Sequence, residues 1–225
     1  MTFTPEEWAA LILSLRIAGM ATFGGLIAAT GFAWLLARTR FPGRVLLDAL
    51  LHAPLVLPPV VIGFVLLILF GTQGPIGRWL DQIWGIRLAF TAGGAALAAG
   101  VSAFPLMLRA VRLSIEAVDP ALEDAARSLG AGAWDRAFTI VLPLALPGLV
   151  AAAVVGFAAA LGEFGAVITF AANIPGETQT LPLAIYAALQ VPGGEASAAR
   201  LSAISFAAAL AGLLLSELLL RWRRR

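Results

Sequence analysis

The stretch Asp119-Pro-Ala-Leu-Glu-Asp-Ala-Ala-Arg-Ser-Leu-Gly130 is polar within a very apolar chain, and it continues through Trp134-Asp-Arg136 to Ile140-Val-Leu-Pro143. Asp119 is a favourable N-cap, and Pro120 suits the first helical position because its missing N–H costs nothing there. Gly130 readily adopts the left-handed conformation that ends helices. These signals predict a short helix that ends at Gly130, followed by a sharp turn and a second short helix.

The predicted helix has one apolar and one charged face. Its apolar residues recur at three- and four-residue spacing: Leu122, Ala125, Ala126 and Leu129. The opposite face carries Glu123, Asp124, Arg127 and Ser128, and Glu123 is placed to pair with Arg127 one turn further on. A helix of this kind can rest on lipid or enter a groove of another protein. The small alanine face favours a protein groove.

These residues also resemble a known motif, the cytoplasmic EAA loop of ABC importer permeases. The matching pattern is Asp124-Ala-Ala126, Gly130 six residues after Asp124, and then Ile140, Leu142 and Pro143. Asp124 stands where that family usually has glutamate, which keeps the carboxylate and shortens its reach. The resemblance implies that residues 116–143 form a coupling loop, whose helix sits in a groove of an ATPase subunit. The implied coupling residues are Glu123, Asp124, Ala125, Ala126, Gly130, Ile140, Leu142 and Pro143.

The composition indicates an integral membrane protein. Of the 225 residues, 60% are hydrophobic and 12% are charged, and the mean hydropathy is +0.94, which is too apolar for a soluble core. All 15 basic residues are arginine and cysteine is absent. Without lysine the chain cannot form a Walker-type nucleotide site, so we expect ATP and Mg²⁺ on a partner chain. With no cysteine and a single histidine, we expect no metal or cofactor site in this chain. We also expect no nucleic-acid site, because the arginines lie at membrane edges.

Five apolar segments have the character of membrane spans, which need about 20 residues: 8–36, 45–70, 89–108, 144–161 and 198–220. A shorter segment, 181–191, suggests a re-entrant or interfacial helix. We therefore predict an all-α, polytopic membrane bundle of five transmembrane helices in a single domain, residues 1–225. A sixth crossing arises if 8–36 or 181–191 contains an extra one. Residues 71–79 are interpreted as a loop, with Trp79 and Trp84 as interfacial aromatics.

The second segment contains Pro58 and Pro59, which should kink or unwind it. Freed backbone is tolerated at membrane depth only against protein or a water-filled path, so this segment is expected to line the conduit. Arg16 lies inside the first segment, where it could pair with an acid or extend to the outer face, and we favour the second. His52 is interpreted as a polar contact at a helix end.

The arginines also predict the orientation. Eleven lie on the side of the EAA-like loop: Arg38, Arg40, Arg44, Arg109, Arg112, Arg127, Arg136, Arg221, Arg223, Arg224 and Arg225. The other side has Arg78, Arg87 and Arg200. The positive-inside rule places the loop and the C-terminus in the cytoplasm, and five spans then place the N-terminus outside. Glu6 and Glu7 precede the first segment without any basic residue, so we expect a retained anchor rather than a cleaved signal peptide.

The region after the fourth segment resembles the molybdate permease branch of the EAA family. The likeness is carried by Gly162-Glu-Phe-Gly165, by Asn173-Ile-Pro-Gly-Glu-Thr-Gln-Thr180 and by Leu181-Pro-Leu-Ala-Ile-Tyr186. Sulfate permeases share the first element and the early Asn173-Ile-Pro175, so these two separate oxyanion permeases from peptide or sugar permeases better than molybdate from sulfate. An oxyanion path needs neutral donors rather than strong cationic traps, which fits Thr169, Asn173, Thr178, Gln179 and Thr180. Glu163 would repel an anion, so we expect it to bond backbone at the glycine break or an arginine.

These patterns together predict the membrane subunit of an ATP-driven molybdate importer in the inner membrane. The expected partners are a second copy of the chain, two ABC ATPase subunits and a periplasmic or extracellular molybdate-binding protein. A sulfate, thiosulfate or tungstate permease is the alternative within the family. A secondary transporter would need more titratable groups at mid-membrane than Glu163 alone and usually an internal repeat. An intramembrane enzyme would lack a nucleophile with its base.

Overall fold

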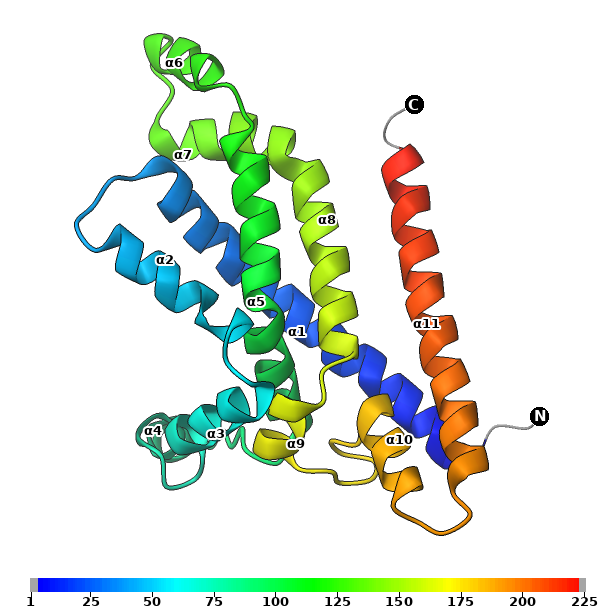
Figure 1. The fold of residues 1–225 in the computed structure, drawn as a ribbon. Helices are drawn as coiled ribbons and strands as arrows, with labels where there is room; N and C mark the ends of the chain where they lie inside the picture. Colours follow the sequence, from blue (N-terminus) through cyan, green and yellow to red (C-terminus); the bar gives the residue numbers. More distant parts are fainter. Residues whose placement is uncertain (1–3, 223–225) are drawn as a thin grey trace.

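The computed structural model describes residues 4–222, and this range is helical without strands (Figure 1). The elements are α1 (Pro5–Arg38), α2 (Arg44–His52), the 3₁₀ turn η1 (Ala53–Leu55), α3 (Pro59–Phe70), α4 (Pro75–Trp84), α5 (Ala92–Glu116), α6 (Pro120–Ser128), α7 (Ala133–Arg136), the π-helical turn η2 (Ala137–Val141), α8 (Leu142–Leu161), α9 (Gly165–Ala171), α10 (Leu181–Leu189) and α11 (Glu195–Trp222). The all-α prediction is therefore confirmed for the described part of the chain.

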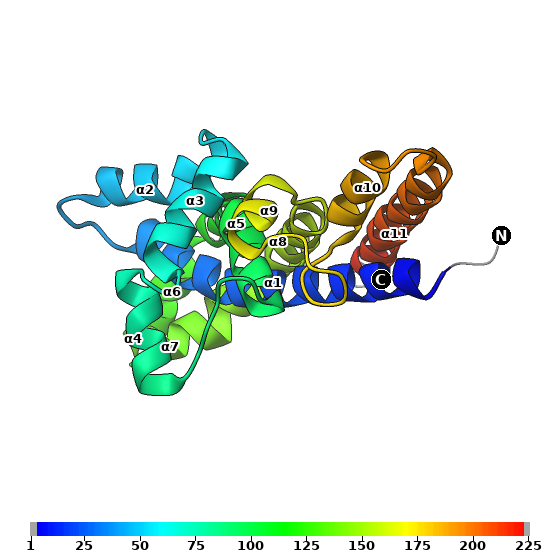
Figure 2. The same ribbon diagram turned by 90° about the horizontal axis from the view of Figure 1, so that it is seen from below.

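The centre of the bundle consists of α1, α5 and α8. Helices α5 and α8 stand side by side and α1 crosses them obliquely (Figure 1). Figure 2 shows that α1 runs the full width of the molecule, with α2 to α4 toward its end and α10 and α11 toward its start. Alanines fill the α1–α5 contact, among them Ala18, Ala29, Ala95 and Ala99, none of which is exposed. Small side chains permit close helix approach where lipid supplies no hydrophobic drive.

Met107 of α5 joins these three helices at one point. Its side chain is fully buried, and it occupies the space above two glycines, Gly25 of α1 and Gly156 of α8. A Cβ atom at Gly25 would overlap the Met107 methyl group, and one at Gly156 would overlap its sulfur and its Cγ. Both glycines are therefore needed for the thioether to fit. An unbranched, flexible side chain is well suited to such an irregular space.

The second apolar segment is broken, as its prolines predict. Helices α2 and α3 meet at a bend of 114°. Three helical stretches in the described range are long and apolar enough to cross a membrane, namely α1, α5 and the continuous stretch 133–161, and the bent pair provides a fourth. The fifth expected segment falls in α11, where the side chains of residue 213 and of residues 215 onward lie outside the described residues. The prediction of five or six spans is thus supported in its coarser form, a polytopic helical bundle.

The loop expected over residues 71–79 is wrong in its second half, because α4 begins at Pro75. Gly74 is the N-cap and Pro75 takes the first helical turn, which proline favours. The sequence interpretation gave weight to the glycines and prolines and overlooked the helical spacing of Ile76, Leu80 and Ile83. Trp79 and Trp84 lie on this helix with ring centroids 6.4 Å apart, and both are more than half exposed.

The buried glycine at position 156 should be costly to replace. Gly156→Ala places a methyl group against the sulfur and Cγ of Met107, and overpacking of this kind typically costs about 1–3 kcal/mol. Gly31→Ala is the matched control, because nothing lies within 4 Å of the added Cβ there. Thermal unfolding of the purified permease in detergent measures both variants. Equal unfolding temperatures for the two variants would show that Met107 has room to move aside.

Candidate coupling site and transport path

Helix α6 forms as its sequence predicts. The Asp119 carboxylate accepts a hydrogen bond from the Ala121 N–H at 2.9 Å, and Pro120 is the first helical residue. After Ser128 the chain turns through Gly130, whose φ of +88° lies in the left-handed region. Figure 1 shows α6 beyond the end of α5, at the same end of the molecule as α7. Local capping and turn signals are thus sufficient to define this helix.

Residues 4–222 leave most of the apolar side of α6 uncovered. Leu129 is 89% exposed and Leu122 is 47% exposed, and Ala125 beside them is also exposed. Ala126 is partly covered, at the edge of this surface. Large apolar side chains standing free at the end of a bundle indicate a contact with another molecule. We name Leu122, Ala125 and Leu129 the docking face.

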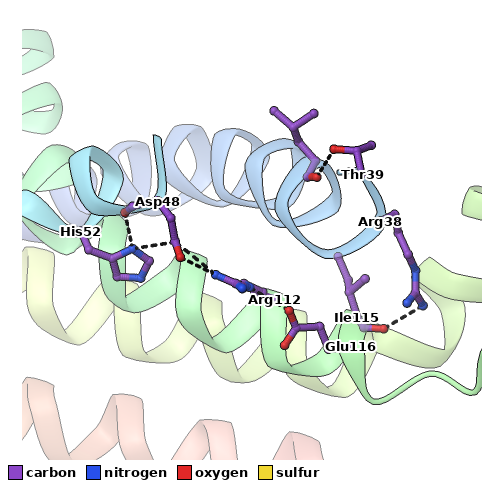
Figure 3. A network of polar contacts seen from close by, with 8 residues as sticks. Arg38, Thr39, Asp48, His52, Arg112, Ile115 and Glu116 are labelled. Carbon is purple, nitrogen blue, oxygen red and sulfur yellow. Dashed lines mark hydrogen bonds and ion pairs between the residues drawn. The ribbon is translucent and has the colours of Figure 1, made fainter. Parts of the chain in front are cut away.

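Arg38 at the end of α1 holds α6 against the bundle. Its Nη2 lies 2.8 Å from Glu123 Oε1. The same nitrogen donates to the Ile115 carbonyl at 3.0 Å, the contact drawn in Figure 3. The Arg38 and Glu123 side chains are only 18% and 13% exposed. One guanidinium therefore connects α1, the last turn of α5 and α6. We name this contact the Arg38 clasp.

The predicted pairing of Glu123 with Arg127 is wrong. Arg127 instead contacts Asp124 at 3.2 Å, and both of these side chains are more than 60% exposed. Glu123 points toward the bundle, where Arg38 reaches it, whereas Arg127 points away. Arg38 is 85 residues earlier in the chain, so nothing in the helix itself indicates this partner.

The other predicted coupling residues divide between two places. Asp124 and Ala125 are exposed on α6, whereas Ile140 lies in η2 and Leu142 and Pro143 open α8. The stretch 133–161 is one continuous helical element that includes η2. The motif therefore joins an exposed helix to the base of a long apolar one.

A second polar network fixes α2 to α5 at the same end. Nη1 of Arg112 donates to both Asp48 oxygens, at 3.1 and 3.0 Å, and its Nε donates to Glu116 at 2.8 Å (Figure 3). Nδ1 of His52 lies 2.8 Å from the Asp48 carbonyl oxygen. His52 is thus a polar contact at the end of α2, as expected from the sequence.

Two of the predicted path hydroxyls are used inside their own turns. Thr178 is fully buried, accepts a hydrogen bond from the Ile174 N–H at 3.0 Å and donates to the Ala172 carbonyl at 3.3 Å. Thr169 donates to the Gly165 carbonyl at 2.8 Å. In this conformation both groups stabilise local structure and have no donor left for a passing anion.

The remaining path candidates gather near α10. The Asn173 amide donates to the Leu183 carbonyl at 3.5 Å, while Asn173 Oδ1 and Thr180 Oγ1 are buried without a partner in the described chain. Gln179 lines a cavity of about 320 Å³ between the start of α1, α10 and α11. The Leu181 N–H donates to the Ser14 hydroxyl of α1 at 2.6 Å, a contact that sequence reasoning missed. A serine in an apolar segment gives no indication of which helix end it caps.

The two breaks in the bundle lie together. The Glu163 carboxylate accepts a hydrogen bond from the Ala166 N–H at 2.9 Å, and this caps α9 just after the end of α8. A Cβ atom on Gly165 would lie 2.8 Å from Cβ of Pro59, which opens α3. The break at Pro58 and Pro59 therefore contacts the break after Leu161, and the two short helices α3 and α9 pack closely. The backbone partner of Glu163 is one of the two expected from sequence.

The described residues thus form a polytopic helical bundle with two broken segments and with one short helix, α6, exposed at one end. Residues 21–225 match the family described as "binding-protein-dependent transport system inner membrane component", and the chain belongs to that family. It is therefore a membrane component of a transport system and not a catalytic enzyme.

Curated relatives match nearly the whole chain. The molybdenum transport system permease protein ModB of Escherichia coli (strain K12) is 54% identical over 224 residues, which cover 100% of this chain and 98% of the relative. The ModB protein of Haemophilus influenzae is 52% identical over 211 residues, 94% of this chain and 92% of the relative. The sulfate transport system permease protein CysT of E. coli K12 is 38% identical over 221 residues, 98% of this chain and 79% of the relative.

Solved structures share the fold. A bacterial ABC transporter involved in the import of the acidic polysaccharide alginate matches with a TM-score of 0.74 at 17% identity, covering 97% of this chain and 80% of that one. The MetNI methionine ABC transporter in an inward-facing conformation matches with a TM-score of 0.72 at 17% identity, covering 98% of each chain. These likenesses show that the chain has the fold of an ABC transporter permease.

The Arg38 clasp should contribute measurably to stability. A double-mutant cycle with Arg38→Gln and Glu123→Gln should give a coupling free energy of about 1–2 kcal/mol, because the pair is charged and largely shielded from water. The control cycle uses Arg127→Gln and Asp124→Asn on the same helix, an exposed pair expected to couple by less than about 0.5 kcal/mol. Unfolding of the four variants in each cycle is followed in detergent. Additive effects at Arg38 and Glu123 would contradict the clasp.

Proposed function

We propose that the chain is the membrane subunit of an ATP-driven importer that moves molybdate into the cytoplasm. The observation that carries this proposal is 54% identity, over essentially the full length of both chains, to a molybdenum transport permease. The exposed docking face of α6 adds a place where a separate ATPase subunit can bind. ATP and Mg²⁺ belong on that partner, because a chain without lysine has no phosphate-loop lysine.

Molybdate is favoured over sulfate by the same comparisons. The sulfate permease relative is 38% identical and its own chain extends beyond the matched part, whereas the molybdenum permeases match along nearly their whole length. Both substrates are tetrahedral dianions, so one architecture suits either, and a binding protein that delivers the anion would add selectivity. Sulfate and tungstate are therefore the competitors to use when uptake of labelled molybdate is measured.

We infer that α6 faces the cytoplasm. Arg38, Arg112 and Arg127 lie at the α6 end, whereas Arg87 and Arg200 lie at the opposite one, and this asymmetry follows the positive-inside rule. Arg223, Arg224 and Arg225 lie outside the described residues. Because the chain has no cysteine, Ser128→Cys and Gln82→Cys report the two ends cleanly. An impermeant thiol reagent should label intact cells at Gln82→Cys only, and labelling at Ser128→Cys would reverse the assignment.

The working assembly is proposed to be two copies of this chain with two ATPase subunits. One chain supplies a single docking helix, whereas ABC ATPases act as a two-fold pair with two grooves. A closed two-fold dimer provides both helices without a second gene. The path would then run between the copies, along the broken segments near Pro58, Pro59 and Glu163. A binding protein would deliver the anion at the α10 end.

The geometry suggests how movement of the ATPase reaches this path. A shift of α6 is transmitted to α1 and α5 through the Arg38 clasp, and to α8 through the short connection from α6 to α7. Helix α8 ends at the Glu163 break, where α9 packs against α3. A displacement of α8 therefore changes the contact between the two short helices. In this mechanism the chain carries out no covalent chemistry.

Uptake measurements test the proposed substrate directly. Cells or proteoliposomes with the permease, its ATPase and the binding protein should take up labelled molybdate only when ATP is supplied. Tungstate in excess should compete strongly and sulfate weakly. Strong uptake of labelled sulfate with no uptake of molybdate would overturn the substrate assignment while leaving the transporter class intact.

Charge placed on the docking face should release the ATPase. Leu129→Glu puts a carboxylate where an apolar groove is expected, and an unpaired buried charge of this kind costs several kcal/mol, enough to abolish co-purification. Ser128→Glu is the matched control, with the same charge one residue earlier on the polar side. Both variants should reach the membrane at wild-type levels. Retention of the ATPase by Leu129→Glu would exclude this face as the contact.

A further inference from the structure

An open pocket of about 560 Å³ lies between α2 and α5, apart from the docking face and from the predicted path residues. Its polar lining comes from Asp48, His52, Arg109, Arg112 and Glu116. Glu116 is the last residue of α5, so the pocket opens at the α6 end of the molecule. Nothing in the coupling mechanism requires a cavity at this position.

The two acidic residues of the pocket already accept hydrogen bonds from within the chain. Both Asp48 oxygens accept hydrogen bonds from Arg112, and Glu116 Oε1 accepts from Arg112 Nε. His52 directs Nδ1 at the Asp48 carbonyl. The same nitrogen lies 3.2 Å from Asp48 Oδ1, so the Nδ1 side of the ring is occupied inside the wall of the pocket. The carboxylates therefore hold the wall of the pocket together and leave few acceptors free.

The cations of the pocket retain unused donors. Arg109 is exposed and makes no hydrogen bond or ion pair within residues 4–222. It precedes Arg112 by three residues on α5, so the two guanidinium groups share a face of the helix. The planar fork of Arg109 and the free Nη2 of Arg112 can both donate to one anion. Guanidinium forks match the oxygens of phosphate-like anions.

The charge balance makes this a weak site. Arg109 and Arg112 are offset by Asp48 and Glu116, so the formal charge of the four groups is zero. An anion would be bound by hydrogen bonds from these donors, without additional attraction from a net positive charge. Sites from which an ion must depart need binding of this moderate strength, because a tight site stops transport.

We propose that the α2–α5 pocket binds a tetrahedral oxyanion through Arg109 and is the exit site where the transported anion pauses before release. The proposal rests on the proposed function for the identity of that anion, whereas the pocket's preference for an oxyanion follows from its donors. The phosphate of an anionic lipid headgroup offers the same chemistry. The test therefore separates the two sources.

A cysteine in the pocket reports occupancy. Ala49 is exposed and lines the pocket, and Ala49→Cys is the only thiol in the chain. The permease–ATPase complex carrying it is treated in lipid-free detergent with a sulfonate-bearing methanethiosulfonate, and the labelling rate is followed as molybdate is added. We expect molybdate to slow labelling, with phosphate as a weaker competitor. Arg109→Gln should weaken the protection about tenfold, the expected loss for a hydrogen bond to a charged group.

Control variants define what each result means. Arg40→Gln removes a cation at the same end but outside the pocket and should leave protection unchanged. Arg109→Lys keeps the charge and should retain part of the protection. Absence of protection by any oxyanion overturns the proposal. Protection by added phosphatidylglycerol but not by molybdate would overturn it as well, and would assign the pocket to a lipid headgroup.

The outcome is separable from the substrate assignment. Labelling is measured without turnover, so it depends on neither uptake nor the binding protein. If the wild type transports molybdate and Ala49→Cys shows no protection, the exit site fails and the proposed function stands. If protection is seen with phosphate and sulfate while molybdate is not transported, the oxyanion site stands and the substrate assignment fails.

Discussion

The seating of Met107 above Gly25 and Gly156 is the constraint on which the rest of the structure depends. It sets how closely α1, α5 and α8 can approach. Because α1 crosses α5 obliquely, that separation also decides where the end of α1 arrives. Arg38 can reach the last turn of α5 and Glu123 together only if the crossing is held at this distance. The placement of α6 thus depends on packing about two and a half helical turns earlier on α5.

Signals within a few residues were sufficient to predict α6 from the sequence, but they were insufficient to predict what α6 packs against. The cap at Asp119, the proline after it and the turn at Gly130 each act within a few residues, so a sequence displays them directly. The partner of Glu123 could not be predicted in the same way. Spacing along one helix suggested Arg127, but burial favours the shielded Arg38, and burial is a property of the assembled bundle. The break at Pro58 and Pro59 was predictable because proline acts on its own backbone.

The roles of the predicted path residues also depend on the assembled bundle and could not be predicted from residue type. Thr178 and Thr169 were chosen as neutral donors, a property of residue type, yet the fold uses both hydroxyls to close turns. Ser14 was passed over as one polar residue in an apolar segment, although it caps α10 across the bundle. Helix α4 was missed for a different reason, because glycine and proline near its start resembled a loop. Residue chemistry indicates what a side chain can do, and only the packing decides which of those uses occurs.

The uninterrupted stretch from α7 through η2 to α8 has a mechanical consequence. A continuous helix resists bending along its length. A displacement of its α7 end would therefore be transmitted to the break at Glu163. Two features interrupt its regular hydrogen bonding, the π-helical turn near its base and Pro147 inside α8. In the proposed mechanism, the stiffness at η2 and at Pro147 would set how much of a displacement of α7 reaches the Glu163 break.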